Sequence, residues 1–507
     1  MPGPSIIADT ADVARRVPDG ATLAISGSGG GLLEPDAILA ALERSFLATG
    51  RPRDLTVVHA LGIGDGRVTG LNRLAHEGMV RRVVGGHWSW SPGMQRLARE
   101  NRIEAYSLPA GVISTLMRES GAGRPGVITR IGLGTFVDPL LDGGRCNARA
   151  RDTLVERVEI AGETFLRYKP LKIDVGIVRG SHVDARGNLS LASEPADLDV
   201  YAVALAAHNT GGRVIAQVRE RRDGPTLPLR LTRVPGILID AVLVAPDQRQ
   251  CAAFDYEPRL SGEARGGAGV FTPALPTGIR RIVAERAMRE LGAARSVNFG
   301  YGIPAGIPAL LRHFGRADTW GTVEQGLHNG DMLDGPMFGA ALDADAIVSS
   351  VDQFDFYAGG GIDAAFLGMG EMDGGGDVNV SRLGDDIVGP GGFIDITQSA
   401  RKVVFCGAFE ARGLAVDRMA DGALRILSPG AQRKLVDRVR HVTFSGAQAR
   451  ANGQEVLYVT ERAVFRLGSD GVELVEIADG VDLQRDVLGR MGFVPRLRVG
   501  APLPAGG

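Results

Sequence analysis

Short apolar runs alternate with amphipathic stretches along most of the chain. A short apolar run that ends in glycine or proline is typical of a buried strand, whereas apolar residues spaced three or four apart are typical of a helix. On this basis strands are expected at residues 22–26, 55–58, 175–178, 213–218, 237–244, 296–299, 346–349, 365–367 and 402–406. Strands that alternate with helices in this way predict an α/β fold with mainly parallel sheets.

One unit of this pattern occurs twice. Residues 11–42 and residues 280–311 both follow the order helix, turn, strand, glycine-rich loop, helix. The repeat predicts two similar α/β domains in tandem, an N-terminal domain at residues 1–260 and a C-terminal domain at residues 279–507. Residues 261–278 are rich in glycine, proline and small residues without periodicity, and are expected to connect the domains. Near the end of the chain, strand pairs are expected before a last helix at residues 481–491.

Composition narrows the class of protein. The 57 Lys and Arg nearly balance the 59 Asp and Glu, and the pI is near 6.5, which argues against a nucleic-acid partner. The three cysteines lie far apart, which argues against a disulfide framework and a cysteine zinc site. No signal peptide and no apolar run long enough for a membrane helix are found, so we expect a soluble, cytoplasmic protein without a membrane partner.

The glycine-rich loops allow two interpretations. Gly300-x-Gly302-x-x-Ala305 follows an expected strand, and Glu324 lies about twenty residues further on, as in the dinucleotide-binding fingerprint. An NAD(P)-dependent oxidoreductase is therefore one hypothesis. The alternative is that both loops are tight turns that serve the fold, since the loop at residues 27–32 lacks the third position of the fingerprint. In either case the backbone N–H groups at the helix starts could receive an anionic ligand.

Residues 319–338 carry the densest group of polar side chains. Glu324 follows a short apolar step and precedes Gly326, which would let a ligand approach the carboxylate closely. Such a glutamate could be a general base, a metal ligand or a nucleophile, or an ordinary surface residue. The spacing of His328, Asp331 and Asp334 matches no metal motif, and no metal is expected.

Several stretches make the chain resemble a known family. They are PRDLTVVHALGIGDG, GVITRIGLGTFVDP, GNLSLASEPA, GGRVIAQV, QFDFYAGGGIDAAFLG, DVNVS, GPGGFIDIT, YVTERAVFRL and EIADGVDLQRDVL, together with TVEQG at residues 322–326. Over nearly its whole length the chain resembles the class I coenzyme A transferases, in particular the acetate/propionate type in which α and β halves are fused. The resemblance implies two domains of the NagB/RpiA/CoA transferase-like fold.

The resemblance also implies an activity. Glu324 would be the nucleophile of a ping-pong exchange of CoA between an acyl-CoA and a free carboxylic acid, through a glutamyl-CoA thioester. Coenzyme A is then a substrate, and no metal or redox cofactor is needed. The resemblance further implies a role in short-chain fatty acid metabolism and a homodimer or homotetramer.

The resemblance extends to the lining of the site. By it, Gly300, Gly302, Gly391 and Gly392 would bind CoA, and Asn379 would line the oxyanion side.

The chain departs from the family at one position that bears on the chemistry. Family members have L-P-Q-G, whose glutamine amide donates a hydrogen bond to the oxyanion, whereas this chain has Leu108-Pro109-Ala110-Gly111. Loss of one such donor typically costs about 10²–10³ in rate. Gln325 or Asn329 could replace the amide in a transferase of altered substrate range, and the small Ala110 would then admit an acyl group bulkier or more polar than acetyl. An acyl-CoA hydrolase and a weakly active paralogue are the alternatives.

Overall fold

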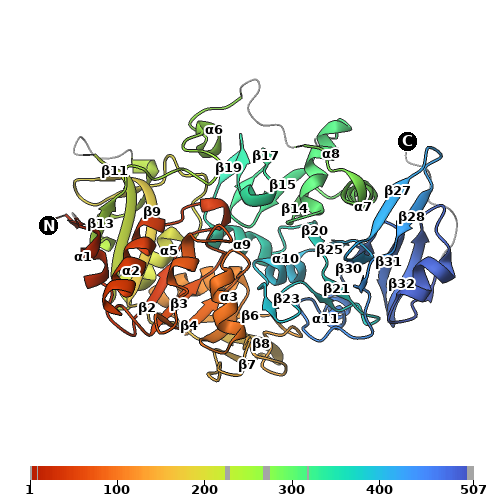
Figure 1. Cartoon of the computed structure of the whole chain (residues 1–507), viewed down its shortest axis with the longest axis horizontal. Coiled ribbons are helices and arrows are strands. Elements are labelled where there is room, and N and C mark those ends of the chain that lie inside the picture. The colour runs from red at the N-terminus through yellow and green to blue at the C-terminus, as the bar shows by residue number, and fades with distance from the viewer. Residues whose placement is uncertain (1–2, 8, 223–228, 267–273, 317–318, 499–507) are drawn as a thin grey trace. The chain divides into compact units, whose positions relative to one another are not determined.

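The computed structural model describes residues 3–7, 9–222, 229–266, 274–316 and 319–498. The chain divides into two compact units, which are both drawn in Figure 1. Unit 1 contains residues 1–270, 324–355 and 382–395, and unit 2 contains residues 271–323, 356–381 and 396–507. These units do not follow the expected division at residues 261–278, because two segments of the second half are grouped with the first. Residues 267–273 of the expected connector lie outside the described residues.

Unit 1 is built on a sheet whose main path is entirely parallel. The strands run in the order β1 (Ser5–Ile7), β13 (Ala241–Val244), β11 (Arg213–Arg222), β9 (Val175–Asp184), β2 (Thr22–Ile25), β3 (Leu55–His59), β4 (Val80–Gly85) and β5 (Glu104–Ser107). Two short strands, β10 (Leu189–Ser190) and β12 (Thr232–Val234), pair antiparallel at the side of β9. The carboxyl ends of β2 to β5 therefore meet at one edge, where parallel α/β sheets place their ligands.

Helices cover both faces of this sheet (Figure 1). They are α1 (Thr10–Arg15), α2 (Asp36–Thr49), α3 (Pro92–Arg99), α4 (Ala110–Gly121) and α5 (Val200–Asn209), while the short helix α6 (Pro258–Ser261) lies away from the sheet (Figure 1). Alternate residues of β9 face opposite sides: Val175 and Ile177 join the core cluster of α1, α2 and α3, whereas Gly176 lies against α5. A helix approaches Gly176 so closely that a side chain there would meet Ala207.

Smaller elements complete unit 1. A three-stranded antiparallel sheet is formed by β6 (Val127–Thr129), β8 (Glu163–Tyr168) and β7 (Val155–Ile160). The segments from the second half contribute β16 (Leu327–His328) paired with β19 (Ala346–Ile347), β17 (Asp331–Met332) paired with β18 (Ala341–Leu342), and β23 (Arg382–Leu383) paired with β24 (Asp386–Ile387). Two helices begin in these segments and end in unit 2, α9 (Ser350–Ala358) and α10 (Phe393–Ser399).

Unit 2 has a sheet that is parallel in its first half and antiparallel in most of its second, where the last pair of strands is parallel again. Its strands run in the order β15 (Trp320–Val323), β14 (Ser296–Phe299), β20 (Ala364–Gly368), β25 (Lys402–Cys406), β30 (Glu455–Val459), β31 (Ala463–Gly468), β32 (Gly471–Ile477) and β33 (Arg496–Leu497). The helices are α7 (Gly278–Met288), α8 (Ile307–His313) and α11 (Gly446–Ala451), and short ladders are formed by β21 (Glu371–Met372) with β22 (Val378–Asn379), β26 (Glu410–Ala411) with β29 (Gln432–Arg433), and β27 (Ala415–Arg418) with β28 (Leu424–Ser428). Helices α7 and α8 supply the apolar cluster against β14, β20 and β25.

The mainly parallel α/β fold expected from the sequence is confirmed. Three expected elements differ. The strand expected at residues 346–349 is reduced to the two residues of β19, which pair antiparallel with β16. The strand expected at residues 237–244 begins only at Ala241, because residues 236–238 form a 3-10 turn after Pro235. The last helix is a π turn (Leu483–Val487) followed by a 3-10 turn (Leu488–Arg490) rather than a regular α-helix. Among the described residues, none of the helices combines the length and apolar character needed to span a bilayer.

Candidate active site

Glu324 lies in unit 1, directly after the chain leaves β15. One oxygen of its carboxylate, Oε2, accepts a hydrogen bond of 2.8 Å from the backbone N–H of Gly392. The side chain is partly exposed. Among the described residues no cation pairs with it, so a single backbone N–H is the only group found to stabilise its charge.

The donor belongs to a segment pinned across the carboxyl edge of the unit 1 sheet. We call residues 388–395 the strap. The N–H of Trp88 donates to the carbonyl of Val388, and the N–H of Gly391 donates to the carbonyl of Gly86, both at 2.8 Å. The N–H of Ala110, at the start of α4, donates to the carbonyl of Gly391, also at 2.8 Å. The ends of β4 and β5 thus hold the strap, and the strap holds Glu324.

The position of the carboxylate leaves no room for a side chain at residue 392. A Cβ on Gly392 would collide with Oε2 of Glu324 and would also meet the ring of Phe354, at 2.9 Å. The same ring lies against Gly111. Only glycine at position 392 lets the backbone N–H approach the carboxylate while an aromatic ring closes the other side.

Two carboxyl groups of this site have unusual acidities. Burial raises the pKa of Glu324 to about 7, against the opposing effect of the bond from Gly392. Burial also raises the pKa of Asp395, in the strap, to about 8, and the charge of Glu324 adds to that shift. Asp395 accepts a hydrogen bond of 3.2 Å from the N–H of Gly111. Perturbed carboxyl groups that share a site without a cation are typical of catalytic centres.

Comparison with known proteins supplies the family. A family model described as Coenzyme A transferase matches residues 8–245. Caffeate CoA-transferase of Acetobacterium woodii is 40% identical over 496 residues, which cover 96% of this chain and 94% of that protein. Acetate CoA-transferase YdiF of Escherichia coli K12 is 40% identical over 489 residues, which cover 94% of this chain and 90% of that protein.

A solved structure is similar to this chain over nearly its whole length. The acyl-CoA transferase YdiF of E. coli O157:H7, as a thioester complex with CoA, superposes with a TM-score of 0.91 at 37% identity, covering 98% of this chain and 94% of that one. The chain belongs to the coenzyme A transferase family. It is an enzyme of that family, a CoA-transferase, as the resemblance of its sequence motifs indicated.

The structure of this CoA-transferase brings some of the predicted site residues together. Glu324, Ala110, Gly391 and Gly392 converge at the strap. The side chain of Ala110 is completely buried. The roles assigned to these residues stay predictions, but their proximity agrees with a shared site.

The two candidates for replacing the missing amide are engaged elsewhere in unit 1. Gln325 is buried, and its Nε2 donates to Oγ of Ser28 at 3.4 Å. The amide of Asn329 donates to Asp345 at 2.8 Å. Each side chain would have to give up or share these contacts to reach an oxyanion.

Three further candidates lie in unit 2. Asn379 uses both ends of its amide there: Nδ2 donates to Glu371 at 2.9 Å and Oδ1 accepts from the N–H of Ser381 at 3.1 Å. The N–H of Gly300 donates to the carbonyl of Phe366 at 2.8 Å, which fixes the turn after β14. Gly302 has a positive φ of 89° and open space around it. The CoA-binding roles of Gly300 and Gly302 and the role of Asn379 stay predictions.

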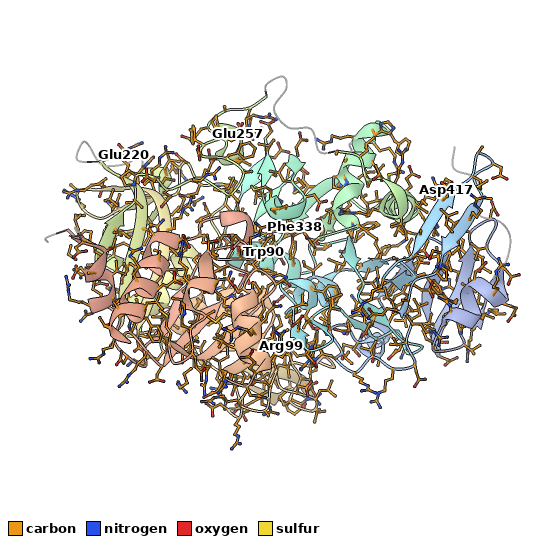
Figure 2. All side chains as sticks on the ribbon, viewed as in Figure 1. Trp90, Arg99, Glu220, Glu257, Phe338 and Asp417 are labelled. Atoms are coloured by element: carbon orange, nitrogen blue, oxygen red, sulfur yellow. The ribbon has the colours of Figure 1, made fainter. Side chains whose placement is uncertain are left out.

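Sequence reasoning missed His87, which sits two residues beyond β4. The Nδ1 side of its ring lies against Gly62, and the indole of Trp90, labelled in Figure 2, lies against both Gly62 and Gly29. Burial lowers the pKa of His87 to about 4, and nearby His59 acts in the same direction. The signal that could have found His87 is its place at the carboxyl end of a parallel strand, where ligands are expected.

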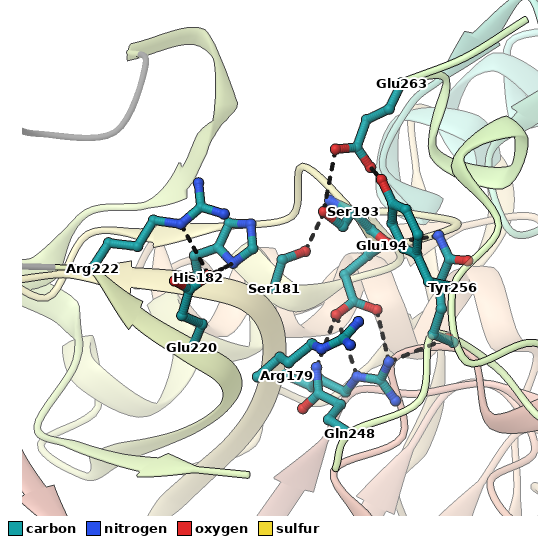
Figure 3. Close-up of a pocket in the computed structure, with 12 residues that line it drawn as sticks. Arg179, Ser181, His182, Ser193, Glu194, Glu220, Arg222, Gln248, Tyr256 and Glu263 are labelled. Atoms are coloured by element: carbon teal, nitrogen blue, oxygen red, sulfur yellow. Dashed lines mark hydrogen bonds and ion pairs between the residues drawn. The ribbon is translucent and has the colours of Figure 1, made fainter. Parts of the chain in front are cut away.

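A second polar region of unit 1 contains none of the candidate residues. A cavity of about 390 Å³ lies at the carboxyl ends of β9 and β11 (Figure 3), and its lining includes three arginines and three glutamates. Arg179, at its floor, pairs with Glu194 at 3.0 Å and also donates to the backbone carbonyls of Gly31 and Arg249. These bonds join the strands to the glycine-rich loop at residues 27–32, so Arg179 has a structural role.

Metal ligation finds no support in the described part of the chain. Within it, no group of three or more histidine, cysteine or acidic side chains is arranged to hold a metal ion. His328, Asp331 and Asp334 are therefore not part of such a group.

Proposed function

We propose that this enzyme transfers CoA between an acyl-CoA and a free carboxylic acid through a covalent thioester on Glu324. The observation that supports the proposal most strongly is the carboxylate of Glu324, which pairs with no cation among the described residues and which one backbone N–H holds by a single oxygen. A carboxylate in this state is a better nucleophile than one in an ion pair, because less stabilisation is lost when it attacks. The solved YdiF relative carries CoA as a thioester, which agrees with the same chemistry.

The exchange of CoA takes place in four steps. The free oxygen of Glu324, Oε1, attacks the carbonyl carbon of the acyl-CoA, and the C–S bond breaks to give a mixed anhydride and CoA thiolate. The thiolate attacks Cδ of Glu324 and expels the first carboxylate, which leaves a glutamyl-CoA thioester. The acceptor carboxylate then attacks Cδ and releases the thiolate, which attacks the new acyl carbonyl and frees Glu324. No proton, metal or redox group is consumed, and we propose that none takes part.

Gly392 would act in the second and third steps. Its N–H already points at Oε2, which becomes the carbonyl oxygen of the anhydride and of the thioester. When the thiolate or the acceptor attacks Cδ, negative charge develops on that same oxygen. A donor that is already in place stabilises the charge without reorganisation, which is the general basis of an oxyanion hole.

The substrates we propose are an acyl-CoA and a carboxylic acid of short-chain metabolism. The relatives give no support to an NAD(P)-dependent oxidoreductase, because the glycines of that fingerprint belong to a chain related to CoA-transferases over nearly its whole length. A cytoplasmic location and a homodimeric or homotetrameric assembly stay predictions from the sequence.

Mass spectrometry tests the covalent step. The enzyme is incubated with acetyl-CoA alone, without an acceptor, and the peptide that contains Glu324 is analysed. We expect a CoA adduct on that peptide and ping-pong initial-rate kinetics. An enzyme that transfers CoA with intersecting kinetics and no adduct would contradict the proposal.

An acceptor titration separates transfer from hydrolysis. For a transferase, release of free acid from acetyl-CoA beyond one equivalent depends on added carboxylate, and a new acyl-CoA accumulates. Continuous CoA release at a rate indifferent to carboxylate would instead identify a hydrolase, in which water attacks the glutamyl intermediate.

Ala110 is expected to set the acyl preference. Glutamine adds a longer, polar side chain at this buried position beside the strap, so Ala110→Gln should shift the ratio of kcat/KM from bulkier or more polar acyl-CoA donors toward acetyl-CoA, by about tenfold for one or two methylene equivalents. A donor panel from acetyl-CoA to aromatic acyl-CoA measures the shift. An unchanged ratio would show that position 110 does not face the acyl group.

A further inference from the structure

The space above Gly391 is bordered by two side chains that face each other. At the position of a Cβ on Gly391, the nearest atoms outside the adjacent residues are Cδ2 of His87 and Oε1 of Glu324, both at 3.8 Å, and Oε2 of Glu324 at 3.9 Å. These are ordinary contact distances, so an atom the size of an oxygen or a methyl carbon fits between the imidazole edge and the carboxylate. Oε1 is the carboxylate oxygen that the bond from Gly392 leaves free.

The imidazole edge that faces this space carries an available nitrogen. Nε2 is bonded to Cδ2 and so lies on the same edge, whereas Nδ1 faces Gly62. Within the part of the chain that the structure describes, the ring of His87 has no hydrogen-bond partner, and the side chain is partly exposed. The backbone of this residue is fixed, because the adjacent Gly86 and Trp88 are both bonded to the strap.

The ring is uncharged at neutral pH, because burial and nearby His59 lower its pKa to about 4. A neutral imidazole can donate one N–H to a developing oxyanion and keep its proton, which an acidic imidazolium would tend to give away. A neutral ring also forms no ion pair with Glu324, so it leaves the nucleophile free.

A hydrogen-bond donor to the oxyanion is needed because position 110 lacks the glutamine amide. The side chain of Ala110 carries no amide, and the side chains of Gln325 and Asn329 are bonded to Ser28 and Asp345. Ala110 and His87 are both next to Gly391: the N–H of Ala110 binds its carbonyl, and the imidazole edge faces its Cα. A donor lost from one side of Gly391 can therefore be replaced from the other.

We propose that His87 is a catalytic residue that stabilises the oxyanion of the acyl-CoA when Glu324 attacks it, and that it replaces the amide absent at position 110. The inference rests on the proposed covalent transfer. As Oε1 bonds to the thioester carbonyl carbon, the π electrons move to the carbonyl oxygen, which lies in the space above Gly391 and accepts the Nε2–H bond. When the C–S bond breaks, the carbonyl re-forms, the thiolate leaves, and His87 still holds its proton.

Two amide substitutions at His87 test which nitrogen of its ring donates the hydrogen bond. The amide nitrogen of glutamine can occupy the place of Nε2, whereas that of asparagine reaches only the place of Nδ1. In single-turnover reactions with acetyl-CoA, we expect His87→Ala and His87→Asn to form the Glu324 adduct about 10²–10³-fold more slowly than wild type, and His87→Gln to recover at least about tenfold of that loss. His208→Ala, at the end of α5, is the matched control and should keep the wild-type rate.

A double substitution tests the replacement itself. Ala110→Gln should accelerate adduct formation in the His87→Ala background by at least about tenfold more than it does in wild type, because the restored amide supplies the missing donor. Thermal unfolding and calorimetric binding of free CoA, both expected within error of wild type, show that the variants are folded and bind.

The outcomes separate the two proposals. If wild type forms the adduct and His87→Ala forms it within about threefold of the same rate, His87 is not the donor and the covalent mechanism stands. If His87→Asn matches His87→Gln, or if the gain from Ala110→Gln is the same in both backgrounds, the assignment of Nε2 as the replacement is overturned. If wild type forms no adduct, the proposed function itself fails.

Discussion

Buried acids are held in opposite ways at two places in the molecule, one in unit 2 and one in unit 1. In unit 2, Arg462 is almost completely buried and binds Glu461 at 2.8 Å, Glu410 at 3.3 Å and the backbone carbonyl of Asp486 at 2.9 Å. In the described part of unit 1, Glu324 and Asp395 are held only by the backbone N–H groups of the strap and of α4. The ion pairs of Arg462 stabilise the packed interior of unit 2, whereas the arrangement in unit 1 leaves the carboxylate of Glu324 able to react.

The apolar surroundings strengthen this contrast. The guanidinium of Arg462 lies 4.5 Å from the ring centroid of Phe409, so the aromatic ring there adds to the stabilisation of a cation. The ring of Phe354 instead lies beside an anion. Burial beside apolar groups raises the pKa of a carboxylate, as it does for Glu324.

The largest effect is expected from removing the reactive carboxylate. Glu324→Gln keeps the size and the acceptor for Gly392 but cannot attack, so kcat/KM should fall by at least about 10⁴-fold and the CoA adduct should disappear. Glu461→Gln is the matched control in unit 2, where adduct formation should persist while stability falls. An adduct in Glu324→Gln would place the nucleophile elsewhere.

The next effect concerns the paired acids. Arg462→Met leaves Glu410 and Glu461 buried without their common cation, and the free energy of unfolding should fall by about 3–5 kcal/mol. Arg485, which is exposed and pairs with Asp486, gives the control, since Arg485→Ala should cost no more than about 1 kcal/mol. Chemical denaturation measures both. Equal losses would show that burial does not distinguish the two arginines.

A smaller effect is expected at the strap. Gly392→Ala places a methyl group against Oε2 of Glu324 and the Phe354 ring, which displaces the carboxylate from its donor. Adduct formation should slow by about 10²–10³-fold, the usual cost of one oxyanion donor. Gly368→Ala in β20, where a Cβ meets only Tyr301 at 3.6 Å, should leave the rate unchanged. A wild-type rate in Gly392→Ala would exclude Gly392 as the donor.

The smallest effect is a change in the free energy of unfolding with pH. Glu324 and Asp395 ionise near pH 7 and pH 8 in the folded protein, but near pH 4 when unfolded. Between these values the native state binds more protons than the unfolded state, so both groups reduce stability as pH rises from about 4 to 8. Relative to wild type, Glu324→Gln should gain on the order of 1–3 kcal/mol of stability between pH 5 and pH 8. Denaturant titrations at both values check the sign, and a constant difference would contradict the raised pKa.

Much of the fold follows from short-range patterns. The strands β14 and β25 begin and end at the expected residues, because an apolar run ends in a glycine or polar turn at each side. The glycine-rich turn after β14 was also expected. The last helix was not predicted correctly: residues 481–491 have helical apolar spacing, yet they form a π turn and a 3-10 turn. Periodicity indicates helical spacing and does not distinguish between helical hydrogen-bond patterns.

The site could be predicted only in part. Glu324, Gly391 and Gly392 were found through family motifs, and the structure places them together. Asp395 lies in the motif GPGGFIDIT, but the sequence assigned it no role. His87 was missed, because its place in the site depends on the strap, which lies about three hundred residues further along the chain. Contacts of such long range carry no local signature in a single sequence.

The strap is held almost entirely by main-chain atoms. Bonds of Val388, Gly391 and Gly392 to their partners use backbone N–H and C=O groups, which every residue other than proline provides. The positioning of the nucleophile therefore tolerates changes of side chain along this segment, except at Gly389, Gly391 and Gly392, where a positive φ or a close contact requires glycine, and at Asp395, whose carboxylate binds Gly111. New acyl specificities could arise by substitution around Glu324 while the means of holding it stays the same.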